Sequence, residues 1–74
     1  MDLSDLVVSD PDVMSGAPCF RATRVPLSVL FENLAAGMSV EEILETWPAL
    51  RREDVLAVLA LAGEEAGRHA ARAA

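Results

Sequence analysis

The stretch that decides the fold is MSGAPCFRATRVPLSVLFENLAAGMSVEEILETWPALRREDVL, residues 14–56. It opens with a Gly/Pro turn and a Thr-Arg-Val-Pro entry, and three short amphipathic helical patterns follow. Breaks at residues 37–39 and 47–50 separate these patterns, because Gly37 closes a helix and Pro48 stops one. Short helices joined by such turns are typical of a helix-turn-helix architecture.

The first predicted helix covers residues 26–36. Pro26 suits its first turn, and Gly37 lies just past its end. Between them, apolar residues recur at the i, i+3, i+4, i+7 spacing of one helical face. These residues are Leu27, Leu30, Phe31 and Leu34.

The second predicted helix is about two turns long and starts after Ser39. Ser39 and Glu42 match a capping box, in which each side chain accepts a hydrogen bond from the other residue's backbone. Trp47 belongs to the apolar face of this helix, where core packing is the expected role, and Pro48 ends it.

The third predicted helix begins near Arg51 or Arg52, and its expected core stripe is Val55, Val58, Leu59 and Ala62. The other side is also apolar, although a solvent-facing side would normally be polar. It is therefore predicted to contact a second copy of the chain. The predicted dimer contacts are Leu56, Ala57, Ala60 and Leu61. After Ala62 the chain either continues as helix or frays, since Gly63 and Gly67 weaken the pattern.

Before the helices, residues 6–8 and 19–21 form two short β-leaning runs that are predicted to pair as a hairpin. The expected fold is mainly α, a three-helix helix-turn-helix core with a short N-terminal β-hairpin. It is read as one domain of 74 residues, with a hairpin arm at 1–25, a core at 26–62 and a polar, Ala-rich tail at 63–74.

Composition and charge point to a protein that binds other macromolecules. The chain is 53% hydrophobic, which is much apolar material for one small monomer, so a homodimer is expected. Its formal net charge is −6, and every basic residue is arginine. A duplex-binding face is usually basic, so DNA binding by the chain alone is expected to be weak. Cys19 is the sole cysteine, and no segment suggests a signal peptide or a membrane span, which predicts a cytoplasmic protein.

No catalytic constellation is apparent. His69 is the sole histidine and lies in the tail, and Cys19 is expected to be a small buried hydrophobic residue. The sequence has no Gly-rich phosphate loop and no paired metal ligands. The prediction is a non-enzyme without cofactor or metal.

Arginines near the starts of the predicted elements are the candidate polar contacts. Arg24 precedes Pro26 by two residues, so its backbone is held extended. Its side chain either locks Asp10 or Asp12 across the hairpin or reaches a partner. Arginines at the start of the third helix stand where a recognition helix meets DNA. The full set of predicted DNA or partner contacts is Arg21, Thr23, Arg24, Arg51 and Arg52.

The order of several motifs resembles a known bacterial family. The motifs are Gly16-Ala17-Pro18, then Ala22-Thr23-Arg24-Val25-Pro26, then Leu34-Ala35-Ala36-Gly37-Met38-Ser39, then Glu41-Glu42-Ile43-Leu44 before Pro48, with Leu50 and Glu53-Asp54-Val55 closing the set. The chain is similar, roughly over residues 10–62, to the family of unknown function numbered 433. That resemblance implies a small helix-turn-helix fold with an N-terminal hairpin.

The chain departs from the family pattern at three positions. Ala17 stands where Lys is common, and Arg51 replaces a usual Ser/Thr helix cap. Ala22 stands where Gly is usual, which predicts that the turn there does not need a positive φ, because alanine tolerates one poorly.

Members of the family often resemble antitoxins paired with a PIN-like nuclease toxin. The leading hypothesis is therefore an antitoxin-like regulator that occludes a cognate nuclease by protein contact and binds its own operator only weakly when alone. Acidic groups at residues 2–12 or 41–45 are the expected contact with the nuclease's basic RNA groove. The alternatives are a stand-alone helix-turn-helix transcription regulator and a plain dimerisation module.

Overall fold

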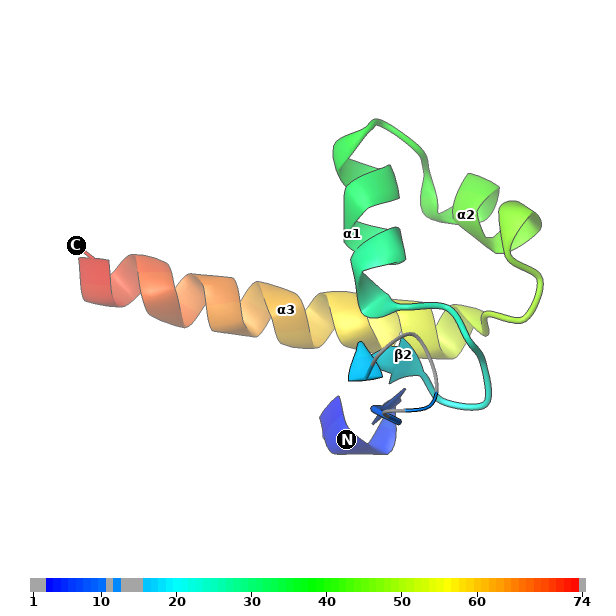
Figure 1. Ribbon diagram of the computed structural model, residues 1–74. Coiled ribbons are helices and arrows are strands. Elements are labelled where there is room, and N and C mark those ends of the chain that lie inside the picture. Colours follow the sequence, from blue (N-terminus) through cyan, green and yellow to red (C-terminus); the bar gives the residue numbers. More distant parts are fainter. Residues whose placement is uncertain (1–2, 11, 13–15, 74) are drawn as a thin grey trace.

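The computed structural model describes residues 3–10, 12 and 16–73 of the chain (Figure 1). Its elements follow one another in the order 3-10 helix η1 (Leu3–Asp5), β1 (Val7–Val8), β2 (Cys19–Phe20), α1 (Leu27–Ala35), α2 (Val40–Thr46) and α3 (Arg52–Ala73). Three helices and a short two-stranded sheet confirm the predicted mainly α fold with an N-terminal hairpin.

The hairpin is antiparallel, with Val7 opposite Phe20 and Val8 opposite Cys19, as the sequence predicted. After β2 the chain turns and runs back along the same strand, so that Phe20 N donates to Val25 O at 3.0 Å and Cys19 bridges to Pro26. Two strands of two residues are not stable alone in water. This doubling back anchors them directly to the start of α1.

The turn after β2 corrects one expectation. Ala22 has a φ of 59°, which lies in the left-handed region. The turn does require a positive φ, and the chain meets that requirement with alanine. An L-residue pays roughly 1–2 kcal/mol in this conformation because its Cβ crowds the backbone.

Local signals fixed the helix ends closely. Pro26 is the N-cap of α1, one residue outside the helix that was predicted to contain it. The capping box of α2 is confirmed, since Glu42 N donates to the Ser39 hydroxyl at 3.1 Å and Ser39 N donates to the Glu42 carboxylate at 3.1 Å. The third helix begins at Arg52, within the predicted bounds.

One apolar core joins the hairpin arm to all three helices. Phe20 from β2, Leu30 from α1 and Ile43 from α2 are each at most 1% exposed. Trp47 packs against this cluster, as predicted, and Cys19 is buried, also as predicted. The buried members of the cluster are Leu6, Phe20, Leu30, Ile43, Leu50, Val55 and Val58.

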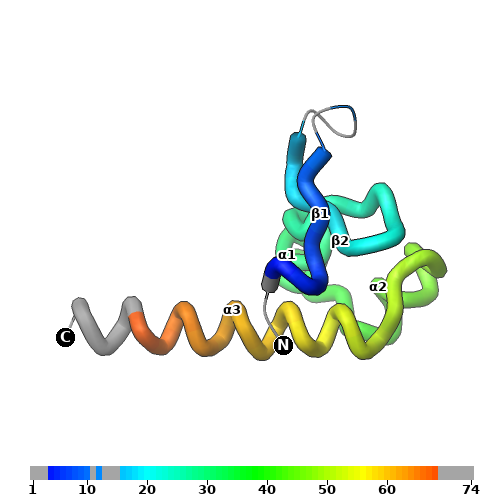
Figure 2. The backbone as a smooth tube through the Cα atoms, turned by 90° about the horizontal axis from the view of Figure 1, so that it is seen from below, coloured from blue at the N-terminus to red at the C-terminus, as the bar shows by residue number. Residues whose placement is uncertain are grey.

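Helix α3 has two unlike halves. In Figure 1 its first half lies between α1 and α2 on one side and the hairpin arm on the other, whereas its second half extends past all of them in both views (Figures 1 and 2). The sequence left open whether the chain beyond Ala62 is helical, and α3 continues to Ala73 through both glycines. Residues 63–68 are all exposed.

The outer face that was predicted for α3 needs a correction. Leu56 is 49% exposed and Ala60 is exposed, as expected of that face. Ala57 and Leu61, however, are partly buried and pack against the core. The reason is that the side of α3 turned toward the core is wider than the predicted stripe, and Leu61 on this side lies across a groove from Leu27 and Phe31 of α1.

Candidate functional site

Arg21 and Asp54 form the most buried ion pair among the residues that the structure describes. Arg21 Nη2 and Nε donate to the two carboxylate oxygens of Asp54 at 2.8 and 3.1 Å, and Nη1 donates to Asp5 O at 3.3 Å. The Asp54 side chain is 4% exposed and that of Arg21 38%. This hydrogen-bonded pairing with Asp54 raises the pKa of Arg21. The two-pronged contact ties the turn after β2 to the first turn of α3.

Thr23 also bonds within its own turn. Its hydroxyl donates to Phe20 O at 2.7 Å and accepts from Val25 N at 3.1 Å. Such hydroxyl–backbone bonds stabilise a turn locally. Both Arg21 and Thr23 were predicted to contact DNA or a partner, and in the structure the polar atoms of both are already engaged by the chain itself.

Arg52 pairs with Glu41 across the turn between α2 and α3. Its Nη1 donates to Glu41 Oε1, and its Nη2 donates to Oε2 at 2.7 Å. The bond from Arg52 lowers the pKa of Glu41 below its ordinary value of 4.5, and the same bond raises the pKa of Arg52. Both side chains are more than half exposed, so the pair orients the two helices only weakly.

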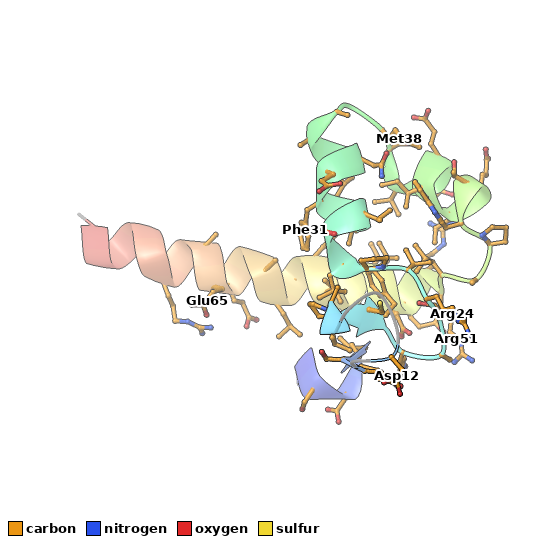
Figure 3. The ribbon with its side chains drawn as sticks, viewed as in Figure 1. Asp12, Arg24, Phe31, Met38, Arg51 and Glu65 are labelled. Atoms are coloured by element: carbon orange, nitrogen blue, oxygen red, sulfur yellow. The ribbon has the colours of Figure 1, made fainter. Side chains whose placement is uncertain are left out.

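Arg24 and Arg51 are exposed and form no ion pair with the residues that the structure describes. They lie at the same end of the molecule, where α3 begins (Figure 3). The suggested lock from Arg24 to Asp10 or Asp12 is not formed in the described part of the chain, and Asp10 Oδ1 accepts from Asp12 N at 2.9 Å. Of the five predicted polar contacts, these two are left with unengaged guanidinium groups.

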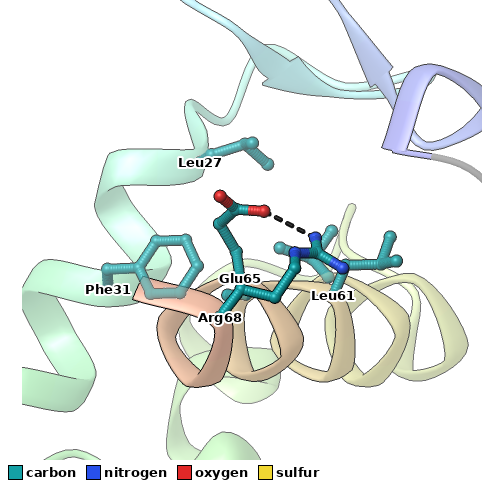
Figure 4. Close-up of a pocket in the computed structure, with 7 residues that line it drawn as sticks. Leu27, Phe31, Leu61, Glu65 and Arg68 are labelled. Atoms are coloured by element: carbon teal, nitrogen blue, oxygen red, sulfur yellow. Dashed lines mark hydrogen bonds and ion pairs between the residues drawn. The ribbon is translucent and has the colours of Figure 1, made fainter. Parts of the chain in front are cut away.

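An apolar groove lies between α1 and the middle of α3 (Figure 4). It has a volume of about 430 Å³. Leu27 and Phe31 form one wall, Leu61 lies on the other, and an ion pair from Arg68 Nη2 to Glu65 Oε2 at 2.6 Å edges it. The sequence placed Leu61 on a contact face and assigned the other apolar residues of the groove to the core-facing stripes of their helices, but it predicted no groove between them.

One of these features, the buried carboxylate of Asp54, had a signal in the sequence. Asp54 is four residues before Val58 and seven before Leu61, so an acid stands in line with apolar residues on one helical face. A charge at such a position needs a partner, which turned out to be Arg21. The groove depends on how α1 crosses α3, and no local pattern encodes that crossing.

The described residues also bear on two other features, a metal site and a membrane-spanning helix. No group of three potential metal-ligating side chains occurs among residues 3–10, 12 and 16–73. Within the same described part of the chain, no helix combines the length and apolar character that crossing a bilayer requires.

These observations define a small, mainly helical domain with a hairpin arm, two exposed arginines at one end and an apolar groove along its longest helix. The chain belongs to the family described as protein of unknown function (DUF433), which matches residues 7–62. The match confirms the resemblance seen in the motifs.

A curated relative is the uncharacterized protein y4eO of Sinorhizobium fredii (strain NBRC 101917 / NGR234), which is 45% identical over 51 residues. The alignment covers 69% of this chain but 23% of the relative, so the chain spans less than a quarter of that protein's length. No solved structure matches the chain.

Proposed function

We propose that this protein is an antitoxin-like regulator that neutralises a PIN-like nuclease by protein contact. The observation that carries the proposal is the pairing of its arginines. Arg21, Arg52 and Arg68 are each held by an acid of the same chain, in a protein whose net charge is −6. The remaining surface is therefore predominantly acidic, which suits the basic groove in which a nuclease holds RNA.

The hairpin arm is the better of the two acidic surfaces for this contact. On α2, Glu41 is held by Arg52 and Glu42 by the capping box. Asp10 and Asp12, near the tip of the hairpin, are exposed. Carboxylates on a projecting arm can enter a groove that the bulk of the domain cannot.

The direct test is co-expression with a PIN-like nuclease encoded beside this protein, followed by affinity capture and an RNA-cleavage assay. We expect capture and inhibition, and we expect Asp10→Lys together with Asp12→Lys to weaken inhibition at least tenfold. Glu32→Lys together with Glu45→Lys, on α1 and α2, is the matched control, since both residues are exposed and the charge changes by the same four units away from the arm. We expect it to leave inhibition nearly intact. A neighbouring nuclease that is neither captured nor inhibited would refute the proposal.

Operator binding is the second candidate, and Arg24 and Arg51 favour it because their guanidinium groups are unengaged at the end where α3 begins. Two phosphate contacts for each chain would give a slope of about −2 in log affinity against log salt. A mobility shift on the upstream DNA at two salt concentrations measures this slope. We expect weak, salt-sensitive binding that Arg24→Ala and Arg51→Ala each reduce, while the melting temperature hardly changes. Nanomolar binding that is insensitive to salt would contradict the charge argument.

A further inference from the structure

The groove between α1 and α3 leaves apolar side chains uncovered in the single chain. Phe31 is 39% exposed although it lies on the same helix as the fully buried Leu30. Together with Leu27 and Leu61 it lines the groove of about 430 Å³ beside α3 (Figure 4). An apolar groove between two helices, with a charged pair at its edge, suits an amphipathic helix.

The same chain carries a helix that lacks cover. The second half of α3 extends past the body, residues 63–68 are exposed, and a Cβ at Gly63 or Gly67 would meet open space (Figures 1 and 2). Glycines disfavour an isolated helix, and a helix this short is marginal in water without packing. Each copy therefore presents an apolar groove and, at residues 63–68, an exposed stretch of helix.

We propose that two copies of the chain associate through this groove, with the second half of each α3 lying antiparallel in the groove of the other copy. The charges at the edge support this arrangement. Glu65 and Arg68 are separated by one helical turn, and they pair within the chain at 2.6 Å. When two such helices cross antiparallel between these positions, Glu65 of one copy faces Arg68 of the other, and the reverse contact forms by symmetry.

Self-complementarity favours a second copy over an unrelated helix as the occupant. One wall of the groove, the occupant and both charges of the edge belong to α3, and α1 of the same copy supplies the other wall. A single two-fold axis therefore satisfies both copies and closes the assembly as a dimer. The inference is independent of nuclease or DNA binding, since neither uses this surface in the proposals above.

The first test is sedimentation of the whole chain from about 1 to 200 µM, a range in which a dimer of this kind should form. We expect the mass to rise from that of the monomer to that of the dimer. A mass that remains monomeric throughout would overturn the inference.

Charge reversal then tests the register of the two helices. Glu65→Arg alone and Arg68→Glu alone place like charges opposite each other in their own homodimers, so each should dimerise on the order of tenfold more weakly. When the two variants are mixed, every facing pair becomes opposite in charge, and a heterodimer should form with affinity near that of the unaltered chain. The charges within each chain are the same alone and in the mixture, so recovery on mixing reports contacts between copies only.

Leu56→Glu serves as the control for the opposite face of α3, where Leu56 is 49% exposed. We expect it to leave the dimer intact, while Phe31→Glu weakens it. Failure of the mixed variants to recover, or loss of the dimer in Leu56→Glu but not in Phe31→Glu, would show that the groove is not the interface.

Discussion

The body and the projection of this molecule share one helix yet differ in what supports them. The body comprises the described residues up to 62, and the projection comprises residues 63–73. In the body, α3 contributes Val55 and Val58 to a core shared with the hairpin, α1 and α2. In the projection, residues 63–68 are exposed, and the ion pair between Arg68 and Glu65 joins two residues of the same helix. A continuous helix is therefore stabilised by packing at one end and by local propensity, or by a partner, at the other.

The family comparison follows the same division. The DUF433 match covers residues 7–62 and ends where the projection begins. The body thus carries the shared fold, whereas Glu65 and Arg68, which edge the groove, lie outside the matched segment. Variants placed on either side of this boundary should behave differently.

The largest expected difference concerns two phenylalanines. Phe20→Ala removes a side chain that is 1% exposed and should lower the free energy of unfolding by about 4 kcal/mol, most of the stability of a domain this small. Phe31→Ala makes the same change at a residue that is 39% exposed and should cost about 1 kcal/mol in the monomer. Urea unfolding followed by circular dichroism at low concentration compares them. Equal losses would mean that Phe31 belongs to the core.

Ion pairs provide the next contrast. Asp54→Ala removes the buried acceptor of Arg21 and should cost about 2 kcal/mol, since hydrogen bonds to charged groups are among the stronger ones. Glu65→Ala breaks an exposed pair in the projection and should change the stability of the monomer by less than about 0.5 kcal/mol. Thermal melts of both variants at one low concentration would show the difference. Equal losses of stability in Glu65→Ala and Asp54→Ala would contradict the assigned difference between the exposed and the buried pair.

The turn at Ala22 offers a smaller and opposite effect within the body. Ala22→Gly should stabilise the protein by about 1 kcal/mol, because glycine accepts a φ of 59° without crowding. Ala36→Gly is the control, since Ala36 has a φ of −80° and gains nothing from glycine. Its stability should stay level or fall. A loss of stability in Ala22→Gly would indicate that the turn is not strained.

The smallest expected effect is the loss of the Glu41–Arg52 pair's contribution to stability at acidic pH. The pKa of Glu41 is lowered by Arg52, so the stabilisation from this pair is fully present above the ordinary value of 4.5 and disappears as the pH falls through the lowered one. Because both side chains are exposed, Glu41→Gln should make a barely measurable difference at pH 7 and none well below pH 4. Melting temperatures of the two proteins at several pH values test this, and a difference that grows in acid would reverse the assigned sign.

Sequence patterns predicted the features that depend on adjacent residues, such as helix ends. They missed the contacts that depend on how one element packs across another. Ser39 and Glu42 predicted the start of α2, and Pro48 predicted its end, because a capping box and a proline each act within about one helical turn. The pairing of Arg21 with Asp54 joins residues 33 apart in sequence, and no local pattern specifies it. Leu61 was assigned to an outer face because helical periodicity does not show which side of α3 the helix α1 covers. That side is determined by how the two helices pack. Ala22 was misjudged since its strain is imposed by the doubling back of the chain along β2.

Amide hydrogen exchange at two concentrations tests the central claim most directly, namely that the projection is ordered by a second copy. Below the dissociation constant of the dimer, amides of residues 63–73 should exchange quickly, while those of the core in α1 and the first half of α3 stay protected. Above it, residues 63–73 should become at least tenfold better protected, and the core amides should change little. Protection of residues 63–73 that is the same at both concentrations would contradict the claim.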